Sequence, residues 1–149
     1  MSVRKRFGVR LWVLAAAAVV ALLPASRAGA EQSAPLRRFA FVAGSNDGGP
    51  SLEKLKYAES DARSFADVLQ DLGGVKPRDL VLVSNSSLQR FRDGLQRVQQ
   101  MVGSPKEMDE RRELIFYYSG HSDDEGLILG TDRVRWEDLR QDLASMPAE

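Results

Sequence analysis

The residue of this sequence best suited to chemistry is His121, its only histidine. It follows the apolar run 114–118 and two small residues, Ser119 and Gly120. A buried strand that ends in this way places the imidazole at the edge of a sheet, where open α/β proteins bind their ligands. A histidine can also exchange a proton near neutral pH. The pattern is therefore compatible with a general base at residue 121, and a purely structural or surface histidine is the alternative that the residues alone leave open.

The residues beside His121 can assist a base, but they do not supply a good nucleophile. Gly120 lets the backbone turn tightly, and the N–H of Ser122 can form half of an oxyanion hole in the same crevice. Ser119 and Ser122 flank the base too closely to present their hydroxyls to its ring, and neither stands in a G-x-S-x-G elbow. The chain has no cysteine. We therefore expect the nucleophile to lie outside these 149 residues.

The elements that must position His121 follow from the hydrophobic pattern. Near-continuous apolar runs predict buried strands, and stripes at helical spacing predict helices that pack on them. The expected strands are 39–44, 80–83 and 114–118, and the expected helices are 57–72, 86–102 and about 137–146, with a hairpin over 127–136. Residues 77–79 have the composition of a turn, and 106–113 that of a solvated loop.

This order of elements predicts a three-layer α/β/α sandwich with a mainly parallel sheet. Right-handed crossovers give the strand order 2-1-3. The loop at 44–49 then lies beside 119–122, at the carboxyl edge of the sheet. The last expected helix has no strand to return to, so we expect further strands beyond residue 149 and interpret the sequence as a fragment, truncated after its third helix.

Residues 1–30 have the pattern of a cleaved signal peptide. A basic start precedes the uncharged apolar run 11–23, and Ala28-Gly29-Ala30 is an A-x-A cleavage site. The thirteen residues of that run are fewer than the about twenty that span a bilayer, although an uncleaved anchor is the alternative. Residues 31–36 would be a linker and 37–149 a partial domain. We expect export to the periplasm or the medium, without stable membrane association after cleavage.

The charge balance argues against a nucleic-acid partner. The sequence has 21 basic and 21 acidic residues; five of the basic ones and none of the acidic ones lie within 1–30, so cleavage leaves a net charge of −5. A nucleic-acid-binding protein needs a clustered basic face.

Without cysteine an exported domain also has no disulfides, so its stability must come from core packing.

Four blocks of the sequence resemble, in order, those of the caspase-like (clan CD) cysteine peptidases, most of all the bacterial, metacaspase-related members. Residues 39–46 are similar to the first strand, and 55–62 to the L-x-Y-A-x-x-D-A opening of the first helix. Residues 116–121 are similar to the strand that carries the catalytic histidine, and 126–129 to the short strand after it. The resemblance implies the caspase-like fold over this part of the chain.

The resemblance also implies roles for single residues. His121 matches the catalytic histidine, and Ser122 stands at the oxyanion position, where many relatives have glycine. Because that position acts through its backbone N–H, a serine can replace the glycine. Asp61 matches a recurring acidic position near the start of the first helix, which we take as supporting, together with Gly120, and not as catalytic.

The activity implied is that of a cysteine-type endopeptidase acting on peptide or protein substrates. His121 would serve as general base for a cysteine beyond residue 149, so the chain as given would be inactive. We expect no metal or cofactor. Calcium dependence occurs among metacaspase relatives, and Asp123–Glu125 could take part in it. Three consecutive acids do not alternate their ligand directions as an EF-hand loop does, so a solvated acidic turn is the expectation.

Two other functions stay open from the sequence. The first is a secreted, non-catalytic caspase-like module that binds a partner through the crevice at the carboxyl edge. The second is hydrolysis by a serine nucleophile, which the setting of Ser119 and Ser122 disfavours.

Overall fold

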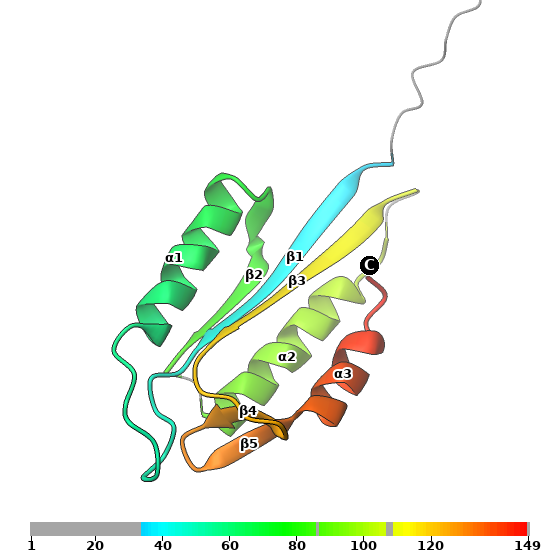
Figure 1. The fold of residues 1–149 in the computed structure, drawn as a ribbon. Helices are drawn as coiled ribbons and strands as arrows, with labels where there is room; N and C mark the ends of the chain where they lie inside the picture. The colour runs from blue at the N-terminus through cyan, green and yellow to red at the C-terminus, as the bar shows by residue number, and fades with distance from the viewer. Residues whose placement is uncertain (1–33, 86, 107–108, 149) are drawn as a thin grey trace, which may run out of the picture. The chain divides into compact units, whose positions relative to one another are not determined.

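The computed structural model describes residues 34–85, 87–106 and 109–148, so the predicted signal peptide lies outside the described residues. Its main sheet has three parallel strands in the order β2-β1-β3, and a two-stranded antiparallel ribbon follows (Figure 1). The elements in chain order are β1 (Leu36–Gly44), α1 (Ala58–Asp71), β2 (Val75–Ser84), α2 (Leu88–Val102), β3 (Arg111–Ser119), β4 (Gly126–Leu129), β5 (Asp132–Arg135) and α3 (Trp136–Ala144). The predicted α/β class and strand order are confirmed.

The central strand β1 is buried on both faces, as its continuous apolar sequence predicts. Its odd-numbered residues Phe39 and Phe41 belong to the core beneath α2, and its even-numbered residues Ala40 and Val42 to the core beneath α1. All four are fully buried. Helix α1 covers one face of the sheet, and α2 and α3 cover the other (Figure 1). The three-layer arrangement therefore follows from the alternation of side chains along one strand.

An aromatic cluster supports the strand that leads to His121. The ring of Phe41 meets Phe91 of α2 edge-on, with centroids 5.0 Å apart, and stacks on Phe116 of β3 at 5.5 Å. Burying a phenylalanine contributes about 1.5–3 kcal/mol, and a favourable aromatic pair adds about 0.5–1.5 kcal/mol. This packing fixes β3 against β1 just before the loop that carries the histidine.

The register of β1 and β3 brings their loops together. The pairing runs without a break from Leu36 opposite Arg111 to Gly44 opposite Ser119. The N–H of Ser45 then donates to the carbonyl of Ser119 at 3.0 Å, which extends the ladder by one residue. The loops after both strands consequently begin side by side, as predicted from the parallel topology.

Strand β2 begins earlier than the sequence indicated. It spans Val75–Ser84, so the turn expected at residues 77–79 is wrong. Pro77 is tolerated because β2 is an edge strand, and its pairing with β1 is irregular between Arg38 and Ala40. Asp79 is 1% exposed and accepts two hydrogen bonds from the Arg37 guanidinium, at 2.7 and 3.2 Å. A partner on the neighbouring strand therefore makes burial of this charge possible.

The solvated loop expected at 106–113 is also wrong in its second half. Strand β3 begins at Arg111, and Arg112 and Glu110 are only 4% and 6% exposed. The Arg112 guanidinium donates to Glu110 Oε1 at 2.7 Å. It also donates to three backbone carbonyls, one from the last residue of α2 and two from the segment just after it. Those carbonyls belong to Val102, Ser104 and Pro105. Carbonyls at a helix C-terminus lack intrahelical partners, so a buried cation there is well placed.

Smaller differences concern the ends of elements. Leu36, predicted as the end of the linker, is the first residue of β1, and α3 begins at Trp136. Ser87 caps α2 as predicted, its Oγ accepting the N–H of Arg90, whereas the alternative cap Ser86 lies outside the described residues. Within the described ranges no helix has the length and apolar character needed to cross a bilayer.

Candidate active site

The loop that carries His121 continues directly into the β4–β5 ribbon. The carbonyl of His121 accepts the N–H of Ile128 at 2.9 Å, and the N–H of Asp123 donates to Gly126 at 3.0 Å. Between these two bonds Ser122 forms an antiparallel bridge with Leu127. The backbone of the predicted base is thus held as an added strand on the ribbon, not as an open loop.

The imidazole of His121 lies across the sheet edge against the loop that follows β1. Its Nε2 atom is 2.9 Å from the backbone carbonyl oxygen of Glu53. A carbonyl can only accept, so Nε2 carries the proton in this arrangement. In the neutral ring, Nδ1 then holds the lone pair, and none of the described residues donates to it. The bond to Glu53 therefore selects the tautomer in which Nδ1 can act as a base.

A glycine allows the imidazole to lie this close to the backbone. A Cβ on Gly48 would overlap the imidazole of His121 and stand 2.8 Å from Nε2. Gly48 belongs to the turn-rich segment that the sequence predicted as a loop beside His121. Sequence analysis missed Glu53, because a backbone acceptor has no side-chain signature.

The loop that carries Gly48 and Glu53 is closed by Asn46. Its carbonyl accepts the N–H of Leu55 at 2.8 Å, and its Oδ1 accepts the N–H of Glu59 in the first turn of α1 at 3.2 Å. Asn46 therefore caps α1 from outside the helix. The neighbouring Asp47 accepts the N–H of Gly130 at 3.0 Å and so ties the loop to the ribbon. The loop that presents the Glu53 carbonyl to His121 is therefore anchored to α1 through Asn46 and to the β4–β5 ribbon through Asp47.

The backbone of Ser122 has the orientation that an oxyanion site requires. Ser122 and Leu127 form the non-hydrogen-bonded type of antiparallel pair, because the two flanking bonds join residues 121 to 128 and 123 to 126. The N–H of Ser122 consequently points away from β4, and it has no acceptor among the described residues. The oxyanion role of this N–H stays a prediction.

Gly120 is required by the side chain beneath it. A Cβ at residue 120 would overlap the Tyr118 hydroxyl and lie 2.5 Å from Cζ. That hydroxyl donates to the carbonyl of Ile128 at 2.6 Å and lies 3.3 Å from the carbonyl of His121. Burial raises the pKa of Tyr118 to about 12, so the phenol keeps its proton at neutral pH.

Asp61, the other predicted supporting residue, is not brought to His121. It is exposed in the first turn of α1, and its N–H donates to the carbonyl of Tyr57 at 2.8 Å. A carboxylate there interacts favourably with the positive end of the helix. That Asp61 is not catalytic stays a prediction.

The acidic turn after the histidine is exposed at Asp124 and Glu125, in keeping with the solvated turn that was expected, and the guanidinium of Arg133 pairs with it. Asp123 Oδ1 accepts the N–H groups of Glu125 and Gly126, both at 3.0 Å, and Arg133 pairs with the carboxylates of Asp123 and Glu125. Desolvation alone would raise the pKa of Asp123, but these N–H groups and Arg133 together hold it below its ordinary value. No three potential ligands among the described residues form a metal-binding group.

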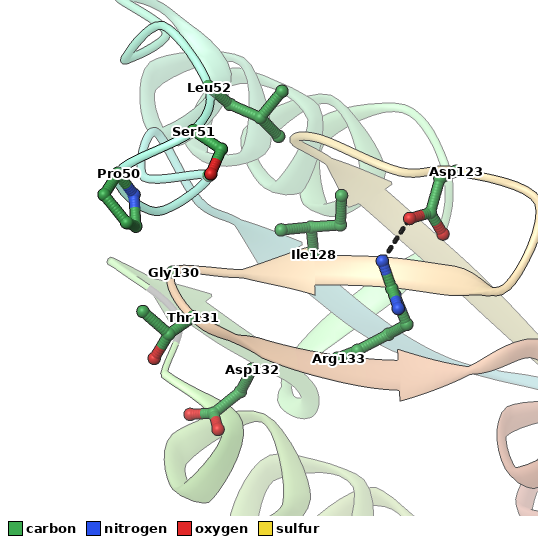
Figure 2. A pocket seen from close by; sticks show the side chains of 10 residues that line it. Pro50, Ser51, Leu52, Asp123, Ile128, Gly130, Thr131, Asp132 and Arg133 are labelled. Atoms are coloured by element: carbon green, nitrogen blue, oxygen red, sulfur yellow. Dashed lines mark hydrogen bonds and ion pairs between the residues drawn. The ribbon is translucent and has the colours of Figure 1, made fainter.

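A cavity of about 490 Å³ opens beside this loop (Figure 2). Residues 50–52 lie on one side and the β4–β5 ribbon on the other, with Arg133 pointing toward Asp123. Gly48, which contacts the ring of His121, also lines the cavity. A second cavity of about 440 Å³ shares residues 130–132 with the first. His121 lines neither cavity, so Gly48 is the residue that links the first cavity to the imidazole.

Comparison with known families decides the relationship. The model of the caspase domain matches residues 37–141. The chain belongs to the caspase-domain family. The resemblance seen in the sequence is confirmed, and the matched part of this caspase domain includes His121, Ser122 and Glu53. The chain matches none of the curated proteins with which it was compared.

Proposed function

We propose that this caspase domain supplies the histidine of a cysteine endopeptidase site, with the thiol coming from outside these 149 residues. The observation that carries the proposal is the 2.9 Å bond from His121 Nε2 to the Glu53 carbonyl. This bond orients the ring and leaves Nδ1 as the basic atom. The chain has no cysteine, so a complete site needs a second segment.

The chemistry is acyl transfer to sulfur and then to water. His121 Nδ1 takes the thiol proton, and the thiolate attacks the carbonyl carbon of the scissile peptide bond. The N–H of Ser122 donates to the oxyanion that forms. When the tetrahedral intermediate collapses, the C–N bond breaks and the imidazolium returns the proton to the leaving amine. Water, deprotonated by the same imidazole, then hydrolyses the thioester and regenerates the thiol.

The test uses the polypeptide that the native gene encodes, read past the codon for Glu149. We expect a further strand that ends in a cysteine, and cleavage of a peptide library by the complete protein. His121→Ala should lower kcat/KM by about 100-fold or more, because a general base usually accelerates the reaction by at least about that factor. Gln89→Ala on the exposed face of α2 is the matched control and should have little effect.

Two results would contradict this proposal. One is a complete protein whose peptidase activity is unchanged by His121→Ala. The other is cleavage by the 149-residue chain itself, which we expect to be inactive because it lacks a thiol. Reaction of the chain with a fluorophosphonate would instead identify a serine nucleophile at Ser119 or Ser122.

A second candidate function is a non-catalytic binding module of the caspase fold. The absence of cysteine from the 149 residues and the cavity between residues 50–52 and the β4–β5 ribbon favour it. A native reading frame whose later strands lack cysteine would support this function. Binding of extended peptides should then be weakened by residues that narrow the cavity, for example Thr131→Trp, and should persist in His121→Ala.

Export is part of the proposal, on the strength of the pattern within residues 1–30. We infer cleavage after Ala30 and release into the periplasm or the medium. Amino-terminal sequencing of the protein from fractionated cells should find Glu31 as the first residue. An intact Met1 on membrane-bound protein would indicate an uncleaved anchor.

A further inference from the structure

We propose that Tyr118 is a positioning residue for His121, because its hydroxyl ties the backbone of the histidine loop to the β4–β5 ribbon. The inference rests on the proposed function of His121 as a base. It concerns a different group, since Tyr118 touches neither the imidazole nor the Ser122 N–H. Its action would be through the main chain of residue 121.

The geometry places the phenol oxygen at a junction of two backbone strands. Its O–H donates to the Ile128 carbonyl at 2.6 Å and stands 3.3 Å from the His121 carbonyl. The His121 carbonyl also accepts the N–H of Ile128 at 2.9 Å. The single phenol proton is directed at the Ile128 carbonyl, and the His121 carbonyl is its longer, second acceptor, so one hydroxyl contacts both the residue that carries the imidazole and the ribbon that supports it.

The surrounding residues make this hydroxyl difficult to replace. The ring of Tyr118 packs against the core beneath α2, with its centroid 6.4 Å from that of Phe91. Gly120 leaves the space that the hydroxyl fills, because a Cβ there would overlap it. The side chain thus reaches from the rigid core to the loop, and the loop sequence is fitted to it.

A loss of this contact should be visible at the imidazole. The Nε2–H of His121 reaches Glu53 only while the backbone of residue 121 keeps its place relative to the loop after β1. Without the hydroxyl, the histidine loop can shift away from the ribbon, and the Nε2–H···O bond opens more often. The Nε2 proton would then exchange faster with water.

The experiment uses the ¹⁵N-labelled 149-residue chain and does not depend on catalysis. Because the chain has one histidine, its imidazole signals need no assignment. The exchange rate of the Nε2 proton is measured at mildly alkaline pH for the unsubstituted chain and for Tyr118→Phe. We expect exchange about five- to tenfold faster in Tyr118→Phe, which corresponds to one net hydrogen bond.

Tyr117→Phe is the matched control, since it removes the same atom from the adjacent residue on the other face of β3. The Tyr117 ring stacks on Phe65 with centroids 4.2 Å apart, and loss of its hydroxyl should leave the exchange rate unchanged. Gly120→Ala tests the contact from the opposite side and should also accelerate exchange. If Tyr118→Phe lowers the melting temperature but leaves the exchange rate at the unsubstituted value, Tyr118 is only structural and the proposal fails. A slow Nε2 proton in both Tyr118→Phe and Gly120→Ala would overturn it equally. None of these outcomes depends on whether a thiol completes the site.

Discussion

His121 donates from Nε2 to the main-chain carbonyl of Glu53, although 68 residues separate the two in the sequence. The acidic side chain of Glu53 is exposed and takes no part in this bond. In many hydrolases a carboxylate orients the histidine, but here a peptide group does so. A peptide carbonyl is neutral, so it orients the ring without placing a negative charge beside the base, as a carboxylate would.

Substitution of Gly48 should displace the imidazole. In Gly48→Ala the new methyl group would occupy the place of the His121 ring, so we expect the protected Nε2–H signal to disappear. Overpacking of this kind destabilises proteins by about 1–3 kcal/mol. Urea unfolding and the imidazole ¹H–¹⁵N spectrum measure the two effects.

Glu53→Ala serves as the control for this prediction. It keeps the carbonyl, so the Nε2–H signal should persist and the unfolding free energy should change by no more than about 0.5 kcal/mol. Loss of the signal in Glu53→Ala would mean that the side chain, not the peptide group, orients His121.

The buried ion pair of Arg37 and Asp79 should contribute much more than an exposed pair. Asp79→Ala leaves a guanidinium with 25% exposure opposite an apolar group, and breaking a buried pair destabilises by about 3–5 kcal/mol. We expect the lower end of that range, because Arg37 can regain some contact with water. Glu137→Ala removes the partner of Arg135 in a pair whose side chains are 64% and 79% exposed, and it should change stability by less than about 1 kcal/mol. Equal losses in urea unfolding would contradict this ranking.

The sequence predicted the position of His121 because the relevant signals are local. Burial of the central strand β1 and partial burial of β3 leave continuous apolar runs, and parallel pairing then fixes which loops meet. The parts of the fold that the sequence did not predict depend on contacts with residues far away along the chain. Pro77 and Asp79 have the composition of a turn, and only Arg37, 42 residues away, makes Asp79 a strand residue.

The candidate site shows the same division. Gly120 and Ser122 could be selected from their places next to the histidine. The acceptor at Glu53 could not, because every residue has a carbonyl and only the folded loop decides which one reaches the ring. Arg133 was missed as the partner of Asp123 because the pairing depends on the register of the β4–β5 ribbon, which hydrophobic periodicity does not define.

Arg112 should not be replaceable by lysine. Its guanidinium serves four acceptors at once, Glu110 Oε1 and three carbonyls near the end of α2. A lysine ammonium has three donors on a single atom and cannot reproduce the planar fork. Arg112→Lys should therefore destabilise the domain by about 2–4 kcal/mol, since buried acceptors lose their partners. Arg111→Lys, on the exposed face of the same strand, should change the unfolding free energy by less than about 0.5 kcal/mol. Comparable losses in the two variants would show that the buried fork has no special role.

The ion pair of Asp123 and Arg133 should give the domain a distinct response to acid. The pKa of Asp123 lies below its ordinary value of 3.8 in the folded protein, so the folded state binds this proton less readily than the unfolded chain does. The stabilisation that results is fully present above the ordinary pKa and is lost as the pH falls through the lowered one.

Asp123→Asn keeps an oxygen that can accept the N–H groups of Glu125 and Gly126, but it removes the charge that faces Arg133. The melting temperature of the unsubstituted chain should therefore exceed that of Asp123→Asn by a constant amount at neutral pH. The difference should shrink below the ordinary carboxyl pKa, because the unsubstituted side chain then becomes neutral as well. Asp124→Asn, at an exposed position of the same turn, is the matched control. Thermal melts of the three chains from neutral pH to strongly acidic solution measure the effect. A difference between the unsubstituted chain and Asp123→Asn that persists unchanged at the lowest pH would contradict this prediction. It would show that the geometry of the carboxyl group, not its negative charge, stabilises the turn.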